Sequence, residues 1–116
     1  MTFSQDEKET LVLAAKACGL SLSFTDIGCM AKFQNESHYT HTWNPLNSDG
    51  DALRLAVKLG LKIETNGTAH WGHVTYVDFS HTKYNGPCET HGDDPYKATR
   101  LAIVAAAAQI GKEKNE

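Results

Sequence analysis

Residues 43–59, which read WNPLNSDGDALRLAVKL, decide much of the fold because they join a proline-containing loop to a strong helix signal. Ser48 is the expected N-cap of this helix, and Asp49 and Asp51 suit the positive end of the helix dipole. Apolar residues then recur at helical spacing, at Ala52, Leu55, Ala56 and Leu59. The sequence therefore predicts a loop over Asn44–Asp49 and a half-buried helix that ends at Gly60.

Two further helices are predicted near the ends of the chain. Ser4 and Glu7 have the spacing of a capping box, and Gly19 stands where a helix C′ glycine is expected. Asp94 and Pro95 are a typical N-cap and first helical residue. An alanine-rich stretch follows as far as Ile110, and Gly111 is expected to end this last helix.

The segments between these helices alternate apolar and polar residues, as half-buried strands do. Strands are predicted at Leu20–Phe24, Cys29–Phe33, Tyr39–Trp43, Leu61–Glu64 and Ala69–Ser80. Asn66–Gly67 predicts a hairpin turn, and residues 81–93 are predicted to be irregular. We therefore predict a single domain over residues 1–116 of the α+β class, a layered sandwich of three helices and one mainly antiparallel sheet of about four to five strands. The strand order stays open. The expected core includes Leu55, Leu59, Trp71, Val77, Phe79, Leu101 and Val104.

Composition excludes several classes of function. The net charge is −3, and lysine and arginine are scattered, whereas duplex nucleic-acid binders carry a basic face. No apolar run reaches the length of a membrane span, and residues 1–10 are too polar and acidic for a signal peptide. Cys18, Cys29 and Cys88 are odd in number and widely spaced, which predicts reduced thiols in a reducing cytosol.

Residues 43–59 and 94–108 together resemble a family of small accessory proteins of tailed phages. More loosely, the chain is similar to the phage ABA sandwich domains, in which a Trp-Asn-Pro-like loop opens one helix and an alanine-rich helix closes the domain. The resemblance covers most of the chain after about Leu11 and implies a phage origin and a host bacterial cytoplasm. It implies no activity and no catalytic residues.

The loop before the central helix is the first candidate binding site. Trp43 and Asn44 precede a helix N-terminus, where free backbone N–H groups bind anions or phosphates, and Arg54 adds a positive charge one turn further. The alternative is structural, with Trp43 in the core and the two aspartates acting only as caps. Those acids also weigh against an anion at this position.

The irregular segment 81–93 is the second candidate, because long loops on a rigid scaffold often bind partners. We expect His81, Tyr84 and His91 to contribute to binding, and the alternative is a plain connector. His81, Cys88 and His91 could also converge on a metal, or Cys88 could act as a nucleophile beside His91. Neither spacing is a known signature, so we expect no metal, no cofactor and no catalytic residue.

These observations favour a non-enzymatic accessory protein that blocks or sequesters a host component in host takeover or anti-defence. The ligand is expected to be a host protein or a small signalling nucleotide, with no duplex nucleic acid and no membrane. The alternative is a small metal- or cysteine-dependent hydrolase that acts on a nucleotide. The alanine-rich last helix also predicts a symmetric homodimer.

Overall fold

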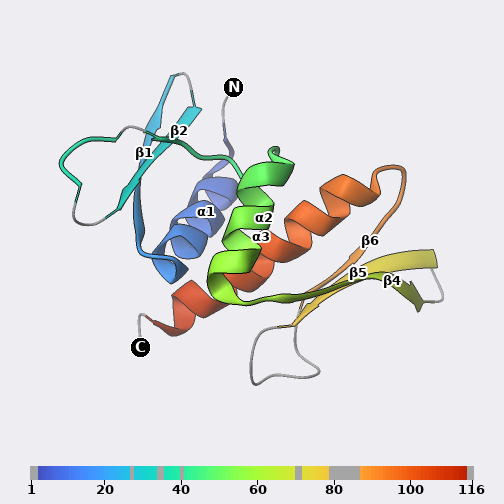
Figure 1. Cartoon of the computed structure of the whole chain (residues 1–116). Helices are drawn as coiled ribbons and strands as arrows, with labels where there is room; N and C mark the ends of the chain where they lie inside the picture. Colours follow the sequence, from blue (N-terminus) through green and yellow to red (C-terminus); the bar gives the residue numbers. More distant parts are fainter. Residues whose placement is uncertain are drawn as a thin grey trace.

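The computed structural model describes residues 3–26, 28–33, 36–39, 41–69, 72–78 and 87–114. In chain order its elements are α1 (Gln5–Ala17), β1 (Leu20–Thr25), β2 (Gly28–Phe33), β3 (His41–Thr42), α2 (Asp49–Leu59), β4 (Lys62–Ala69), β5 (Gly72–Asp78), β6 (Cys88–Thr90) and α3 (Pro95–Glu113). Three helices lie in the middle of the molecule, with one group of strands on either side (Figure 1). No helix within the described ranges is long and apolar enough to cross a bilayer.

The strands form two small sheets, so the predicted single sheet is wrong, although the α+β class and the three helices are confirmed. One sheet has the order β1-β2-β3 and the other β4-β5-β6, and all pairings are antiparallel. The two sheets are separated in sequence by α2, and they lie at opposite ends of the helical layer (Figure 1). Helix α1 packs on β1, and α3 packs on β5 and β6.

Local sequence signals set most helix ends as predicted. Ser4 forms the full capping box with Glu7, and the Ser48 side chain accepts from the Asp51 backbone N–H. Asp94 caps α3 in the same way. Gly60 follows α2 with a φ of 64°, in the left-handed region where a glycine has no steric penalty.

Gly111 does not end the last helix, which continues to Glu113. The glycine lies instead inside α3, where it faces the backbone of α1. A Cβ atom at this position would come within 1.8 Å of the Leu13 carbonyl oxygen. The sequence predicted a helix end at Gly111, but the absence of a side chain there instead allows α3 to approach α1 closely.

Asn66–Gly67 does not form the predicted hairpin turn. Both residues lie inside β4, at a register irregularity between Glu64 and Gly67 that has the character of a β-bulge. The chain reverses later, between Ala69 and Gly72, which face each other in the ladder. The irregular segment predicted over 81–93 also contains a short strand, β6, whose Cys88 pairs with Tyr76 of β5.

The core lies where α1, α2 and α3 meet and extends onto one face of each sheet. Leu55, Val77 and Val104 are buried as predicted, whereas Leu59 and Leu101 are half-buried. Trp71 and Phe79 lie outside the described residues. The small residues of α3 are used inside the domain, and those that are buried are Ala98, Ala102, Ala106, Ala107 and Ala108. The alanine-rich surface that suggested a dimer is therefore occupied by the chain itself.

Candidate functional site

Trp43 is held at the end of the first sheet, where the chain leaves β3 for α2. Its backbone N–H donates to the Cys29 carbonyl at 2.9 Å, which continues the β2 pairing by one residue. The next residue, Asn44, donates its backbone N–H to Asp51 Oδ2 at 2.8 Å. These two bonds fix the loop against both the sheet and the helix, and they leave Trp43 only 8% exposed.

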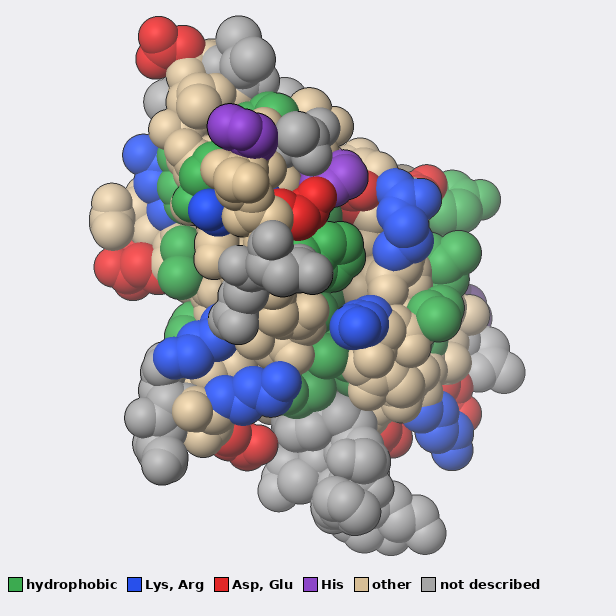
Figure 2. Space-filling model, turned by 60° about the vertical axis from the view of Figure 1, so that its left-hand side comes forward, with side chains coloured by type: hydrophobic (Ala, Val, Ile, Leu, Met, Phe, Trp, Pro, Cys, Tyr) green, Lys and Arg blue, Asp and Glu red, His purple; other side chains and the backbone are tan. Residues whose placement is uncertain are grey.

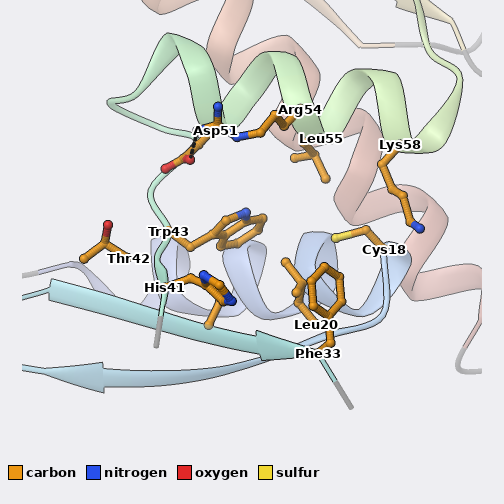
Figure 3. Close-up of a pocket in the computed structure, with 11 residues that line it drawn as sticks. Cys18, Leu20, Phe33, His41, Thr42, Trp43, Asp51, Arg54, Leu55 and Lys58 are labelled. Atoms are coloured by element: carbon orange, nitrogen blue, oxygen red, sulfur yellow. Dashed lines mark hydrogen bonds and ion pairs between the residues drawn. The ribbon is translucent and has the colours of Figure 1, made fainter. Parts of the chain in front are cut away.

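A cavity of about 500 Å³ lies between the first sheet, the end of α1 and the underside of α2 (Figure 3). Its lining is mainly apolar, with charged residues contributed by α2. The residues that line it are Cys18, Leu20, Ala31, Phe33, His41, Thr42, Trp43, Asp51, Arg54, Leu55 and Lys58. Two of the predicted binding residues, Trp43 and Arg54, therefore meet here, and Asn44 supports the loop that carries the first of them.

The indole N–H of Trp43 faces this cavity. Figure 3 shows the indole nitrogen turned toward α2, into the space bordered by Arg54 and Leu55. It makes no hydrogen bond within the described part of the chain. Trp43 as a whole is more than nine-tenths buried, but its indole nitrogen is not among the fully buried polar atoms that lack a partner, so this atom keeps access to the cavity. An accessible N–H at a cavity wall can donate to water or to an acceptor on a bound molecule.

The charged side of the cavity belongs to α2. Arg54 Nη2 lies 2.7 Å from Asp51 Oδ1, so this carboxylate neutralises the guanidinium. Lys58, one turn further on the same helix face, adds a positive charge that no carboxylate of the described residues contacts. Burial raises the pKa of the nearby Cys18 thiol, and Lys58 lowers it by a smaller amount. At the α2 N-terminus the Asp51 backbone N–H donates to Ser48 Oγ, and the Asp51 carboxylate accepts from the Asn44 backbone N–H of the preceding loop, so the chain's own groups take up part of the anion-binding position predicted there.

His41 adds a titratable group at the opposite wall. Its Nε2 lies 3.5 Å from Glu36 Oε2, and Glu36 also accepts from the Phe33 backbone N–H at 2.7 Å. That backbone bond, followed by His41, lowers the pKa of the Glu36 carboxyl. The carboxylate therefore stays ionised and draws His41 toward the end of β2.

His91, the predicted residue of the second loop, lies at a different site. It lines a second cavity of about 570 Å³, on the far side of α2 from Trp43, beside β4 and the first turns of α3. Its Nε2 is 2.8 Å from Thr75 Oγ1, which is 3.0 Å from Thr99 Oγ1. Thr99 in turn donates to the Pro95 carbonyl at 2.8 Å.

The directions of these hydrogen bonds fix the tautomer of the His91 ring. A carbonyl only accepts, so the single Thr99 hydroxyl hydrogen goes to Pro95, and Thr75 must donate to Thr99. Thr75, which is fully buried, then accepts from His91, so the neutral ring carries its hydrogen on Nε2. The ring is locked in place by these bonds, which explains its position without a partner molecule.

The metal and nucleophile arrangements that were considered as alternatives gain no support in the described part of the chain. No group of three or more His, Cys, Asp or Glu residues there could hold a metal ion. Cys88 is exposed and lies beside Tyr76, whose pKa is raised by burial and then by Cys88. Within the described ranges, the His91 ring is hydrogen-bonded to Thr75 and stacks on the His73 ring. His81 and Tyr84 lie outside the described residues.

Several lining residues escaped prediction. Lys58 could have been predicted from the sequence, because it follows Arg54 by four residues and so shares its helix face. Leu20 and Phe33 could not be predicted, because they meet at the cavity only through the pairing of β1 with β2, and Cys18 reaches it from the end of α1.

Lysine and arginine side chains are spread over the face of the molecule shown in Figure 2, separated by hydrophobic and uncharged surface. Comparisons with protein-family models, curated proteins and solved structures gave no match.

Proposed function

We propose that this chain is a non-enzymatic binding protein that sequesters a small, partly apolar and anionic molecule in the cavity beneath α2. The observation that carries the proposal is the Trp43 indole N–H, which belongs to a nearly buried side chain, faces the cavity and has no acceptor among the described residues. A volume of about 500 Å³ falls in the usual range for small-molecule sites.

The lining defines the chemistry of the ligand. Trp43, Phe33 and Leu20 offer apolar and aromatic surface to a flat body, and the indole N–H requires an acceptor on that body. Lys58 and the outer nitrogens of Arg54 would receive an anionic group at the open side. A nucleotide combines these features, with ring acceptors on its base and a phosphate some distance away, so small signalling nucleotides are the class that fits best.

Calorimetric titration of the purified chain with nucleoside monophosphates, cyclic nucleotides and the matching uncharged nucleosides tests this proposal. Trp43→Phe keeps an aromatic ring but removes the N–H, and it should weaken nucleotide and nucleoside binding alike by about tenfold. Arg54→Ala with Lys58→Ala should weaken only the phosphorylated compounds. Lys97→Ala removes one charge at an exposed position of α3, and this control variant should bind as the wild type does.

Absence of binding to the folded protein across the whole panel would refute a nucleotide site. Equal losses for nucleotides and nucleosides in the Arg54 and Lys58 variant would show that these cations do not contact phosphate. The wider role, a phage factor for host takeover or anti-defence acting in the host cytoplasm, stays a proposal that depends on the resemblance of residues 43–59 and 94–108. Capture of such a nucleotide from infected cells by the wild type, but not by Trp43→Phe, would support that role.

A further inference from the structure

Strand β4 forms an edge of the second sheet. Within the described residues it pairs with β5 alone, so its other side presents backbone donors and acceptors to the outside. The regular part of this edge is Lys62–Glu64, because the register is disturbed between Glu64 and Gly67. The free edge is therefore short but regular at its beginning.

Side chains alternate along this edge. Lys62 and Glu64 are exposed on one face, and half-buried Ile63 lies on the other, where it lines the second cavity with Thr65. The cavity opens beside two exposed apolar side chains, Leu53 of α2 at 59% and Tyr96 of α3 at 70% exposure. Exposed apolar side chains gathered at the border of a groove are typical of protein interfaces.

We infer that this surface binds a second copy of the same chain, with β4 paired to β4 in antiparallel fashion about a two-fold axis at Ile63. The sequence Lys62–Ile63–Glu64 is self-complementary in that arrangement, because Lys62 stands opposite Glu64 of the second copy and the reverse pair repeats it. Opposite charges across an antiparallel pair stabilise it, whereas most lysines at free edges repel a second strand. Charge complementarity thus favours a second copy over an unrelated strand.

The two-fold axis also accounts for the exposed apolar residues. It stands perpendicular to the sheet, so α2 and α3 of both copies lie on the same face of one continuous six-stranded sheet. Leu53 and Tyr96 flank the β4 edge on that face, and the two cavities meet over the paired Ile63 residues. Three residues of strand bury too little surface for a stable dimer, and the helices supply the remainder. This inference is independent of the ligand cavity, which lies on the other side of α2.

Light scattering coupled to gel filtration tests the inference on the full chain. The wild type should elute at twice its 12.7-kDa mass. Lys62→Glu sets two glutamates opposite each other across the axis, and Glu64→Lys sets two lysines opposite each other, so each variant alone should associate about tenfold or more weakly. An equimolar mixture of the two restores opposite charges at both cross-strand positions, because the strand with two acids then faces the strand with two bases, and it should recover dimer mass relative to either variant alone. Lys16→Glu, on α1, makes the same change away from the edge and should remain dimeric.

A monomeric wild type at high micromolar concentration would overturn the inference. Dimers of undiminished affinity for both single variants would overturn it as well, because they would place the interface elsewhere. Lys62 also faces Asp78 within the sheet, so Lys62→Glu is checked for an unchanged circular dichroism spectrum. If that variant unfolds, Glu64→Lys decides alone, since Glu64 faces the uncharged Tyr76.

Discussion

Replacement of Gly111 by alanine tests the close packing of α3 against α1. Gly111 lies in α3 against the backbone of α1, and an alanine Cβ would stand 1.8 Å from the Leu13 carbonyl oxygen and 2.7 Å from its carbon. Real Cβ contacts essentially never fall below 3.0 Å, so the helices must move apart by more than about 1 Å. A backbone carbonyl cannot rotate away as a flexible side chain would.

Two opposing effects set the magnitude. Overpacking of a rigid site costs about 1–3 kcal/mol or more, while alanine gains about 1 kcal/mol over glycine in a helix interior. Because α1 and α3 share the most extensive contact of any two elements, the steric cost lies at the upper end. We expect Gly111→Ala to lower the free energy of unfolding by about 2 kcal/mol and the melting temperature by roughly 10 °C.

Urea denaturation followed by circular dichroism measures this loss, which corresponds to a midpoint lower by about 1 M. Gly50→Ala is the matched control, because Gly50 is also helical but its Cβ would meet only the flexible Arg54 side chain, at 3.2 Å. That variant should change stability by less than about 0.5 kcal/mol or raise it. A Gly111→Ala protein as stable as the wild type would show that α1 and α3 do not approach as described.

Three further predictions concern buried groups. Leu55→Ala should cost about 2–5 kcal/mol from lost burial and the remaining cavity, since Leu55 is 3% exposed; a loss in urea under about 0.5 kcal/mol would show that α2 does not pack on the core. Burial raises the pKa of the Cys29 thiol to about 11 from 9.0, so its contribution to stability is complete below pH 9.0 and is lost as the pH rises toward about 11. The wild type should therefore lose stability over this window more steeply than Cys29→Ala, and parallel curves would contradict the shift. Thr75→Val leaves the His91 Nε2–H without its acceptor and should cost about 1–2 kcal/mol. Nitrogen NMR of the wild type should show the Nε2–H tautomer for neutral His91, and the Nδ1–H form would refute the order of hydrogens.

The helices could be predicted closely because their ends depend on neighbours in the sequence. Ser48 caps α2 through a residue three positions away, and Gly60 ends it through its own φ. The same local reasoning predicted the strands β1 and β2, whose alternation is set by one buried face. The α+β class follows from this order of elements without knowledge of any long-range contact.

Predictions failed where a distant contact changes the use of a local signal. Asn66–Gly67 is a good turn sequence, yet β5 pairs across it and converts it into an irregularity within β4. Gly111 resembles a helix stop, but α1 packs against it and the helix continues. The division into two sheets likewise depends on which faces the helices cover, and no spacing in the sequence records that choice.

The candidate site was predicted in part for the same reason. Trp43 and Arg54 belong to one continuous loop and helix, so their proximity follows from local geometry. The rest of the wall includes Phe33, which reaches it through strand pairing, and Cys18, which reaches it from the end of α1. His91 was predicted as part of a separate candidate, the segment 81–93, and its hydrogen bond to Thr75 holds it beside the second cavity.

Helix α2 connects the ligand proposal with the dimer inference because it borders both cavities. Arg54 and Leu55 face the cavity that contains Trp43, while Ala52 and Leu53 face the groove beside β4. Asp49 Oδ1 lies 2.6 Å from Arg100 Nη1 of α3, and the Asp51 carboxylate accepts from the loop that carries Trp43. Charged groups therefore anchor α2 both to α3 and to this loop. A ligand that shifts Arg54 away from Asp51 would loosen the loop but leave the contact with α3 intact. Binding in the first cavity and pairing at β4 should therefore proceed independently, since α2 is anchored separately on each side.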